Sequence, residues 1–297
     1  MKQILAVFSV IFSLFFLNAC DDEKSNAILE SKVIRFQVEI PAHESEAGTR
    51  VDVNALKFEH GDEIGLFVVR RDNTSSSPIQ EKDNYADNVK MTYDSYTNTW
   101  VVDRPIYYFP FDKSQNIKFD FYAYYPYIRG VNPTDMKIWG VLDSQESSIN
   151  LGRSDFMTAC QIGYVVGSDE FVKLHFMHHF SLVRLDYQTK DSQSLPFVGI
   201  RAGQYVVNAF RLDDVAKEEA SLTCGKVSND MLTGMSPLNN SGISGITTYQ
   251  AIVIPQYLDD NPLFYTLKNK ELSSINAENI PIRFEKGKAY RFSPTVD

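Results

Sequence analysis

Three histidines within a stretch of five residues are the strongest candidates for metal chemistry in this chain: His175, His178 and His179. Imidazole nitrogens are common ligands of zinc and copper. Side chains alternate between the two faces of a strand, so His175 and His179 would share one face and His178 would lie on the other. No Asp or Glu lies within the stretch. We therefore expect no metal site and no cofactor, and we expect His178 to be hydrogen-bonded in or near a core.

Sequence patterns that would indicate an enzyme do not occur. The chain has no Gly-x-Ser-x-Gly elbow, no phosphate-binding loop and no HExxH pattern. Carboxylates are plentiful, but they lie in turns and on polar faces, as in Gly61-Asp62-Glu63 and Asp213-Asp214. We expect a protein without catalytic activity.

A cysteine that follows an apolar N-terminal stretch is a candidate for lipid attachment. The apolar run from Ile4 to Leu17 is shorter than the roughly 20 residues that a membrane-spanning helix needs, so residues 1–19 are typical of a secretory signal peptide. Leu17-Asn18-Ala19-Cys20 resembles a bacterial lipobox, in which the thiol is acylated and the cysteine becomes the mature N-terminus. Asp21-Asp22-Glu23-Lys24 resembles a surface-export tag of Bacteroidota lipoproteins. We expect an outer-membrane lipoprotein anchored through Cys20; the alternative is a cleaved signal with an incidental cysteine.

Composition and charge restrict the class of protein further. The 297 residues are 43% hydrophobic, which is enough for a large core and two domains. The formal net charge of -9 and the absence of a long basic run argue against a nucleic-acid partner. Cys160 and Cys224 lie far apart and are expected to be free thiols, with a bridge between them as the alternative in an oxidising envelope.

Period-two alternation of apolar residues predicts strands throughout the chain. In the first of them, Ile34, Phe36, Val38 and Ile40 share one face. A short helix is expected around Asp214 to Ala220. The expected strands lie at Val33 to Ile40, Glu63 to Val69, Trp100 to Tyr108, Ile117 to Tyr125, Phe171 to Gln188, Phe197 to Val207, Thr247 to Pro255 and a hairpin from Ile280 to Ser293.

Short strands separated by loops are typical of β-sandwiches. The turn residues Gly167-Ser168-Asp169 interrupt the pattern near the middle of the chain. We therefore expect one β-sandwich domain at residues 51–168 and a second at residues 169–297.

Clustered aromatic residues allow two interpretations. Tyr107-Tyr108-Phe109 and the stretch from Tyr122 to Tyr127, together with Trp100 and Trp139, could stack on sugar rings. The alternative is that they form the packed faces of a sandwich.

Taken in order, several motifs resemble the fimbrillin family, the type V pilins of Bacteroidota. They cover nearly all of the chain after the signal peptide. The motifs are Thr49-Arg50, Phe58 to Phe67 ("FEHGDEIGLF"), Tyr107 to Pro110, Phe121 to Pro126 ("FYAYYP"), Val172 to His178 with its Leu-x-Phe-x-His pattern, Gln250 to Gln256 and Gly287 to Phe292.

The resemblance implies two tandem transthyretin-like domains, each a seven-stranded β-sandwich. It also implies export as a lipoprotein and removal of a lipidated propeptide, residues 20–50, by an arginine-specific protease that cuts between Arg50 and Val51 at the outer membrane. Such a cut frees the subunit to polymerise with other pilin subunits into a fimbrium that supports cell adhesion.

A cut at Arg50 would also remove the first strand, with the apolar side chains of Ile34, Phe36, Val38 and Ile40. The vacant position could then be filled by a strand of another subunit through β-augmentation. The candidate donor is the C-terminal strand with Ala289, Tyr290, Arg291 and Phe292, although Pro294 leaves little free tail beyond it. Either this strand leaves its own sheet, or the subunit accepts a strand without donating one.

A second hypothesis, from another class of protein, remains open. A permanently anchored surface lipoprotein, either a pilus anchor or an adhesin, could bind a glycan or a host protein through its loops and clustered aromatic residues. The sequence does not separate a stalk subunit from a tip or an anchor.

Overall fold

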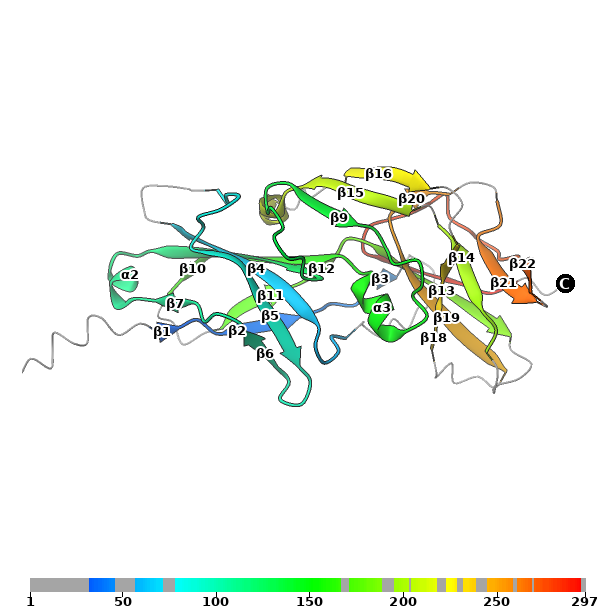
Figure 1. Cartoon of the computed structure of the whole chain (residues 1–297), viewed down its shortest axis with the longest axis horizontal. Coiled ribbons are helices and arrows are strands. Elements are labelled where there is room, and N and C mark those ends of the chain that lie inside the picture. Colours follow the sequence, from blue (N-terminus) through cyan, green and yellow to red (C-terminus); the bar gives the residue numbers. More distant parts are fainter. Residues whose placement is uncertain are drawn as a thin grey trace, which may run out of the picture.

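The structure of the protein is a computed structural model. The structure describes residues 32–45, 57–71, 78–166, 171–188, 195–202, 204–217, 223–228, 232–238, 245–258, 261–268 and 270–294. Figure 1 shows an elongated molecule built almost entirely of strands. The helices in this part of the chain are all too short or too polar to cross a membrane. The all-β sandwich fold expected from the sequence is confirmed.

The helices are short and lie between strands: α2 (Pro110–Ser114), α3 (Ser148–Arg153) and the 3-10 helix η1 (Leu212–Lys217). The strands are β1 (Lys32–Val33), β2 (Phe36–Glu39), β3 (Glu44–Ser45), β4 (Glu63–Arg71), β5 (Ala86–Asp94), β6 (Thr99–Val102), β7 (Tyr107–Tyr108), β8 (Lys118–Tyr125), β9 (Met136–Trp139), β10 (Met157–Val165), β11 (Val172–His175), β12 (Met177–His178), β13 (Ser181–Gln188), β14 (Val198–Arg201), β15 (Gln204–Phe210), β16 (Thr223–Ser228), β17 (Leu232–Gly234), β18 (Ser236–Leu238), β19 (Ile246–Val253), β20 (Gln256–Tyr257), β21 (Phe264–Lys268), β22 (Glu271–Ile275), β23 (Arg283–Phe284) and β24 (Lys288–Phe292).

A six-stranded antiparallel sheet, in the order β12-β10-β8-β4-β5-β6, is buried on both faces. Strand β8 shows why, because its side chains alternate between two apolar cores. Phe121 and Ala123 belong to the core on one face, whereas Tyr122 and Tyr124 belong to the core on the other. A strand buried on both faces gives a nearly continuous apolar run, as in "FDFYAYY".

The first core lies between one face of this sheet and a layer that contains β2 and β11. Strand β2 pairs in parallel with β11, and β1 pairs with β7. Leu66 and Phe121 of the sheet share this core with Ile34, Val172 and Leu174 from the covering layer.

The second core lies under the opposite face of the same sheet. There Phe67 and Tyr122 meet Ile138 of β9, and they also share the core with Leu182 and Ile252. Strand β9 pairs with β15, so both packing and pairing cross the boundary expected near residue 168. The division into two domains stays a prediction.

A third core lies between a five-stranded sheet, β18-β19-β13-β24-β3, and a four-stranded sheet, β17-β14-β21-β22. Val183 and Tyr290 from the first sheet meet Ile200 and Phe264 from the second. Two sheets that pack in this way form a β-sandwich.

Several expectations differ from the structure at particular strands. The prediction of a hairpin from Ile280 to Ser293 is wrong, because β23 pairs with β20 whereas β24 pairs in parallel with β13. Gly287 lies in a turn with a φ of 70°, but the strands on either side of it do not pair with each other; Arg291 of β24 instead forms two hydrogen bonds to Asp186 of β13, at 2.8 and 3.0 Å. The helix expected at Asp214 to Ala220 begins earlier, as η1. The strand expected from Phe171 to Gln188 is three separate strands.

Gly65 of β4 offers a test of the tight packing in the second core. A Cβ at this position would lie 2.2 Å from Cε1 of Tyr124, whose hydroxyl is fixed 2.7 Å from Oδ1 of Asn88. We expect Gly65→Ala to lower the free energy of unfolding by about 2 to 3 kcal/mol, because overpacking displaces the ring. Urea unfolding measures the change.

Gly152→Ala is the matched control, since its Cβ would lie 3.4 Å from the hydroxyl of Tyr125, an ordinary contact, and a helical alanine gains about 0.5 to 1 kcal/mol. Equal stability of the two variants would contradict the packing argument.

Candidate functional site

The N-terminal segment, residues 32–45, contacts three separate parts of the fold. Strand β1 pairs antiparallel with β7, β2 pairs in parallel with β11, and β3 pairs in parallel with β24. Figure 1 shows the segment in blue, passing along the molecule from β1 to β3. These 14 residues therefore supply one strand to each of three sheets: two two-stranded sheets and the five-stranded sheet, in which β3 is the edge strand.

Alternate side chains of the segment face the first core. Ile34 is 3% exposed, and Phe36, Val38 and Ile40 are partly buried against the same core. The ring of Phe36 meets that of Phe121 edge to face, with centroids 5.7 Å apart. These four are the residues expected to share one face, and the structure places all of them there. Displacement of the strand stays a prediction.

Backbone hydrogen bonds hold the segment along its length. The amide of Ile34 donates to the carbonyl of Ile106 at 2.8 Å, and the amide of Phe176 donates to the carbonyl of Glu39 at 2.9 Å. Farther along, the amide of Glu44 donates to the carbonyl of Gly287 at 2.9 Å. Each such bond adds about 1 kcal/mol of net stability.

A groove of about 890 Å³ runs beside β2, on the side away from β11. Phe36 and Val38 line one side of it, and Trp100 and Val102 of the edge strand β6 line the other. Phe58 lies in the groove wall and meets Trp100 edge to face at 4.7 Å. In this part of the structure β2 therefore has a ladder partner on one edge and an open groove on the other.

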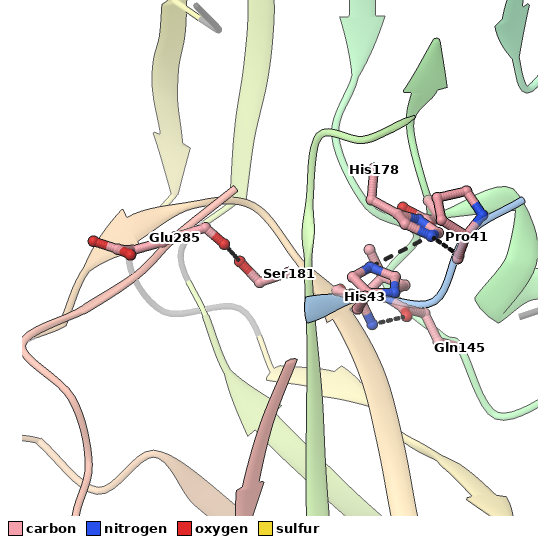
Figure 2. A network of polar contacts seen from close by, with 8 residues as sticks. Pro41, His43, Gln145, His178, Ser181 and Glu285 are labelled. Carbon is pink, nitrogen blue, oxygen red and sulfur yellow. Dashed lines mark hydrogen bonds and ion pairs between the residues drawn. The ribbon is translucent and has the colours of Figure 1, made fainter. Parts of the chain in front are cut away.

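The segment ends against a buried group of two histidines and an aspartate, which we call the His–Asp cluster: His43, Asp155 and His178. Their exposed fractions are 3%, 1% and 5%. Asp155 follows α3, whose N-cap Ser147 accepts a hydrogen bond from the amide of Asn150, and His178 is fixed opposite Met157 by the pairing of β12 with β10. Figure 2 shows His178 beside Pro41 and His43 of the segment.

Both ring nitrogens of His178 face hydrogen-bond acceptors. Nδ1 lies 2.7 Å from Oδ2 of Asp155, and Nε2 lies 2.8 Å from the carbonyl oxygen of Pro41. Carboxylate and carbonyl oxygens only accept, so both nitrogens donate and the ring is an imidazolium. Burial favours the neutral ring, but the Asp155 carboxylate and these two hydrogen bonds raise the pKa of His178 above its ordinary value. The expectation of a hydrogen-bonded His178 in or near a core is confirmed.

His43 is held as a neutral ring. It stacks on His178 with centroids 3.6 Å apart, and neither of its nitrogens has a hydrogen-bond partner among the described residues. Burial lowers its pKa from 6.5 to about 4, although Asp155, with Oδ2 3.9 Å from Nε2, favours the charged form. The positive charges of His178 and Arg184 act in the same direction as burial.

The donor set of the His–Asp cluster does not suit a metal ion. The three residues could present ligand atoms within 4.8 Å of one another. However, both nitrogens of His178 are engaged as donors, and the stacked rings lie at an interplanar angle of 24°, so their in-plane lone pairs do not converge at bonding distance. The geometry is that of a buried ion pair with a neutral ring against it.

The three histidines singled out by the sequence do not converge. His175 is exposed and pairs with Glu39 at 3.0 Å, whereas His178 and His179 are both buried. The expected alternation, with His175 and His179 on one face, is wrong because the strand breaks between β11, β12 and β13. Nε2 of His179 lies 2.6 Å from Oγ1 of Thr158.

The other expected site residues fall into two groups. Cys20, Arg50 and Val51 lie outside the described residues. The expected donor residues form β24, which lies between β13 and β3 and buries Ala289, Tyr290 and Phe292.

The aromatic clusters divide between core and surface: Tyr107 is 43% exposed, and Trp100 and Tyr108 are partly buried against the first core. Tyr122, Tyr124 and Tyr125 are at most 6% exposed, which leaves no face of these rings for a sugar. Cys160 is a free thiol, as expected.

Sequence reasoning missed His43 and Asp155. Neither belongs to a motif, and their contact with His178 joins positions far apart in the chain. The one signal was His178 itself, which was expected to need a partner.

Comparisons with known proteins agree with the fold. The sequence model of a family described as fimbrillin-like matches residues 49–297. A protein described as a candidate cell adhesion protein of Bacteroides ovatus has a TM-score of 0.59 and 17% identity, over 90% of this chain and 96% of that one. A similarly described protein of Bacteroides uniformis has a TM-score of 0.51 and 16% identity, over 86% and 97%. The search of curated proteins found no match.

The contribution of the segment to stability can be measured at Phe36. We expect Phe36→Ala to lower the free energy of unfolding by about 2 kcal/mol, less than for a fully buried ring because Phe36 is only partly buried. Gln37→Ala, on the exposed side of β2, is the control and should change it by less than about 0.5 kcal/mol. A similar small effect for both would mean that β2 does not pack as described.

Proposed function

Since the chain belongs to the fimbrillin-like family, we propose that it is a surface-exposed pilus subunit that is processed at Arg50, accepts a strand from another subunit and supports adhesion. The single observation that carries the proposal is the position of the N-terminal segment. By its contacts the segment is an ordinary part of the fold. It nevertheless precedes all the other strands in the chain, so one cut after it would separate it from them.

Attachment to the outer membrane is the first step of the proposal. The signal-like residues 1–19 and the lipobox-like Cys20 support acylation. Several acyl chains, at about 0.8 kcal/mol per buried methylene, hold a protein on a membrane durably. The subunit would stay attached until the segment is separated from the body.

Cleavage after Arg50 is the second step. Arg50 follows β3 by a few residues, so one cut would separate β1, β2 and β3 from the body together. Burial of Ile34 and of three partly buried side chains contributes roughly 4 to 8 kcal/mol. A domain has a net stability of only about 5 to 15 kcal/mol, so the vacant position favours a replacement strand.

Strand replacement is the third step. An incoming strand can pair with β11 and place alternate apolar residues on the first core, as β2 does. The carbonyl of Arg35 accepts from the amide of Val172 at 2.9 Å, so a replacement must supply an acceptor there. The partner is therefore a chain with an extended segment of alternating apolar residues.

This subunit accepts a strand without donating β24. Phe292 and Tyr290 are buried in the third core, and the ion pair between Arg291 and Asp186 joins β24 to β13. In the uncut chain β24 lies between β13 and β3; once the cut has removed β3, pairing with β13 and burial in the third core still hold β24 in place. A subunit that accepts only would occupy an end of the filament.

Processing can be tested by mass spectrometry of the mature N-terminus on cells. We expect the wild type to begin at Val51 and the Arg50→Lys variant to keep its segment, because an arginine-specific protease does not cut after lysine. Arg129→Lys, at an exposed arginine elsewhere in the chain, should be processed like the wild type. An intact N-terminus in wild-type fimbriae would favour a permanently anchored subunit.

The accepting role can be tested with the cut protein. After removal of its segment, we expect it to bind one synthetic peptide of residues 32–45 and to regain most of its lost stability, because the peptide restores both ladder and core. Thermal unfolding and native mass spectrometry measure the two effects. Growth of the cut protein alone into long ladders would contradict a subunit that only accepts.

A further inference from the structure

We propose that the His–Asp cluster is a docking site and pH-sensitive lock for residues 41–45, closed near neutral pH and opened by mild acid. The lock is a property of the uncut chain. It rests on the proposed function only in its consequence, which is that acid would ease the departure of the segment once it has been cut.

In the closed state residues 41–45 lie against the His–Asp cluster, with His178 charged and His43 neutral. The imidazolium of His178 donates to the carbonyl of Pro41 while Asp155 balances its charge. His43 supplies a flat ring stacked on that imidazolium. The segment therefore contributes an acceptor and an uncharged ring, whereas the body contributes the donor and both charges.

Acid changes the ring that belongs to the segment. A proton on His43 places a second positive charge against His178, in a site where burial already disfavours any charge. Leaving the site relieves both penalties, because a solvated His43 binds its proton freely. Protonation of His43 therefore favours the open state of the segment.

The groups that face His43 do not cancel this effect. Burial is the largest contribution; Asp155 and the backbone carbonyl of Phe180 favour the charged ring, whereas His178 and Arg184 disfavour it. His179, next to His178, is also kept neutral, because burial and Lys286 lower its pKa to about 3. Lys288 of β24 pairs instead with the exposed Glu44 of the segment, and the hydrogen bond from Lys288 lowers the pKa of Glu44, so this carboxylate stays ionised in mild acid.

The pH window follows from the two shifts. The pKa of His43 falls from 6.5 unfolded to about 4 folded, so its contribution to holding the segment is present above pH 6.5 and is lost as the pH falls toward 4. Against the effect of burial, Asp155 of the body raises the pKa of His178, so this ring stays charged as the pH falls below 6.5 and keeps its hydrogen bond to Pro41. The two together hold residues 41–45 best near neutral pH.

Hydrogen exchange of the chain with its segment uncut tests the lock. Exchange of peptides within residues 32–45 is followed by mass spectrometry from pH 7.5 to 4.5 in EDTA, with rates corrected for the intrinsic pH dependence. We expect the opening equilibrium constant to rise below pH 6.5 by up to about tenfold per pH unit. A peptide from β8, residues 118–125, reports global unfolding and should keep its protection.

Three variants identify the ring responsible. His43→Phe keeps a stacked ring without a titrating group, and His43→Gln is a second neutral replacement if the first folds poorly; both should abolish the pH slope. His175→Ala removes an exposed histidine that also contacts the segment, through Glu39, and should leave the slope unchanged. A wild-type segment with no pH slope, a slope that persists in both His43 variants, or one that disappears in His175→Ala would overturn the lock. None of these outcomes depends on a cut at Arg50.

Discussion

The burial of alternate side chains of β2 against the six-stranded sheet is the contact on which the rest of this structure depends. The sheet is apolar on both faces, so both faces must be covered. On the first core, much of that cover comes from a short strand that has a ladder partner, β11, on one edge and a groove on the other. The strand is therefore integral to the core and yet attached to the rest of the chain by few covalent and lateral connections.

The His–Asp cluster adds what apolar contact alone lacks. Hydrophobic burial is not directional, and a slip of one residue along β11 would turn Phe36 and Val38 away from the core. The hydrogen bond from His178 to Pro41 has a fixed length and direction, so it sets where the segment stops. The hydrogen bond at Pro41 therefore sets the register of the segment, and the burial of apolar side chains of β2 contributes most of its stabilising free energy.

The sequence predicted strands where apolar residues alternate with polar ones or form a continuous run. The stretch at Glu63 to Val69 became β4, and the apolar run of β8 was found within one residue of its start. Strand β5, "ADNVKMTYD", was missed because most of its side chains are partly buried and polar, which leaves no period. The hairpin predicted around Gly287 is wrong because a turn reverses the chain locally but does not determine which distant strand pairs with the strands on either side of it. Of the His–Asp cluster only His178 was foreseen, since long-range contacts such as that of His43 with Asp155 leave no local trace.

The pairing of the N-terminal segment also has a consequence for biogenesis. Its strands lie near the start of the chain, but β11 lies beyond the middle and β24 near the end. During synthesis of the chain, the segment is made early and its pairing partners are made late. Closing such long loops is slow, because the entropy of the intervening chain must be lost first. Until then the nascent first core is uncovered, and a chaperone that shields extended apolar strands would find its substrate there.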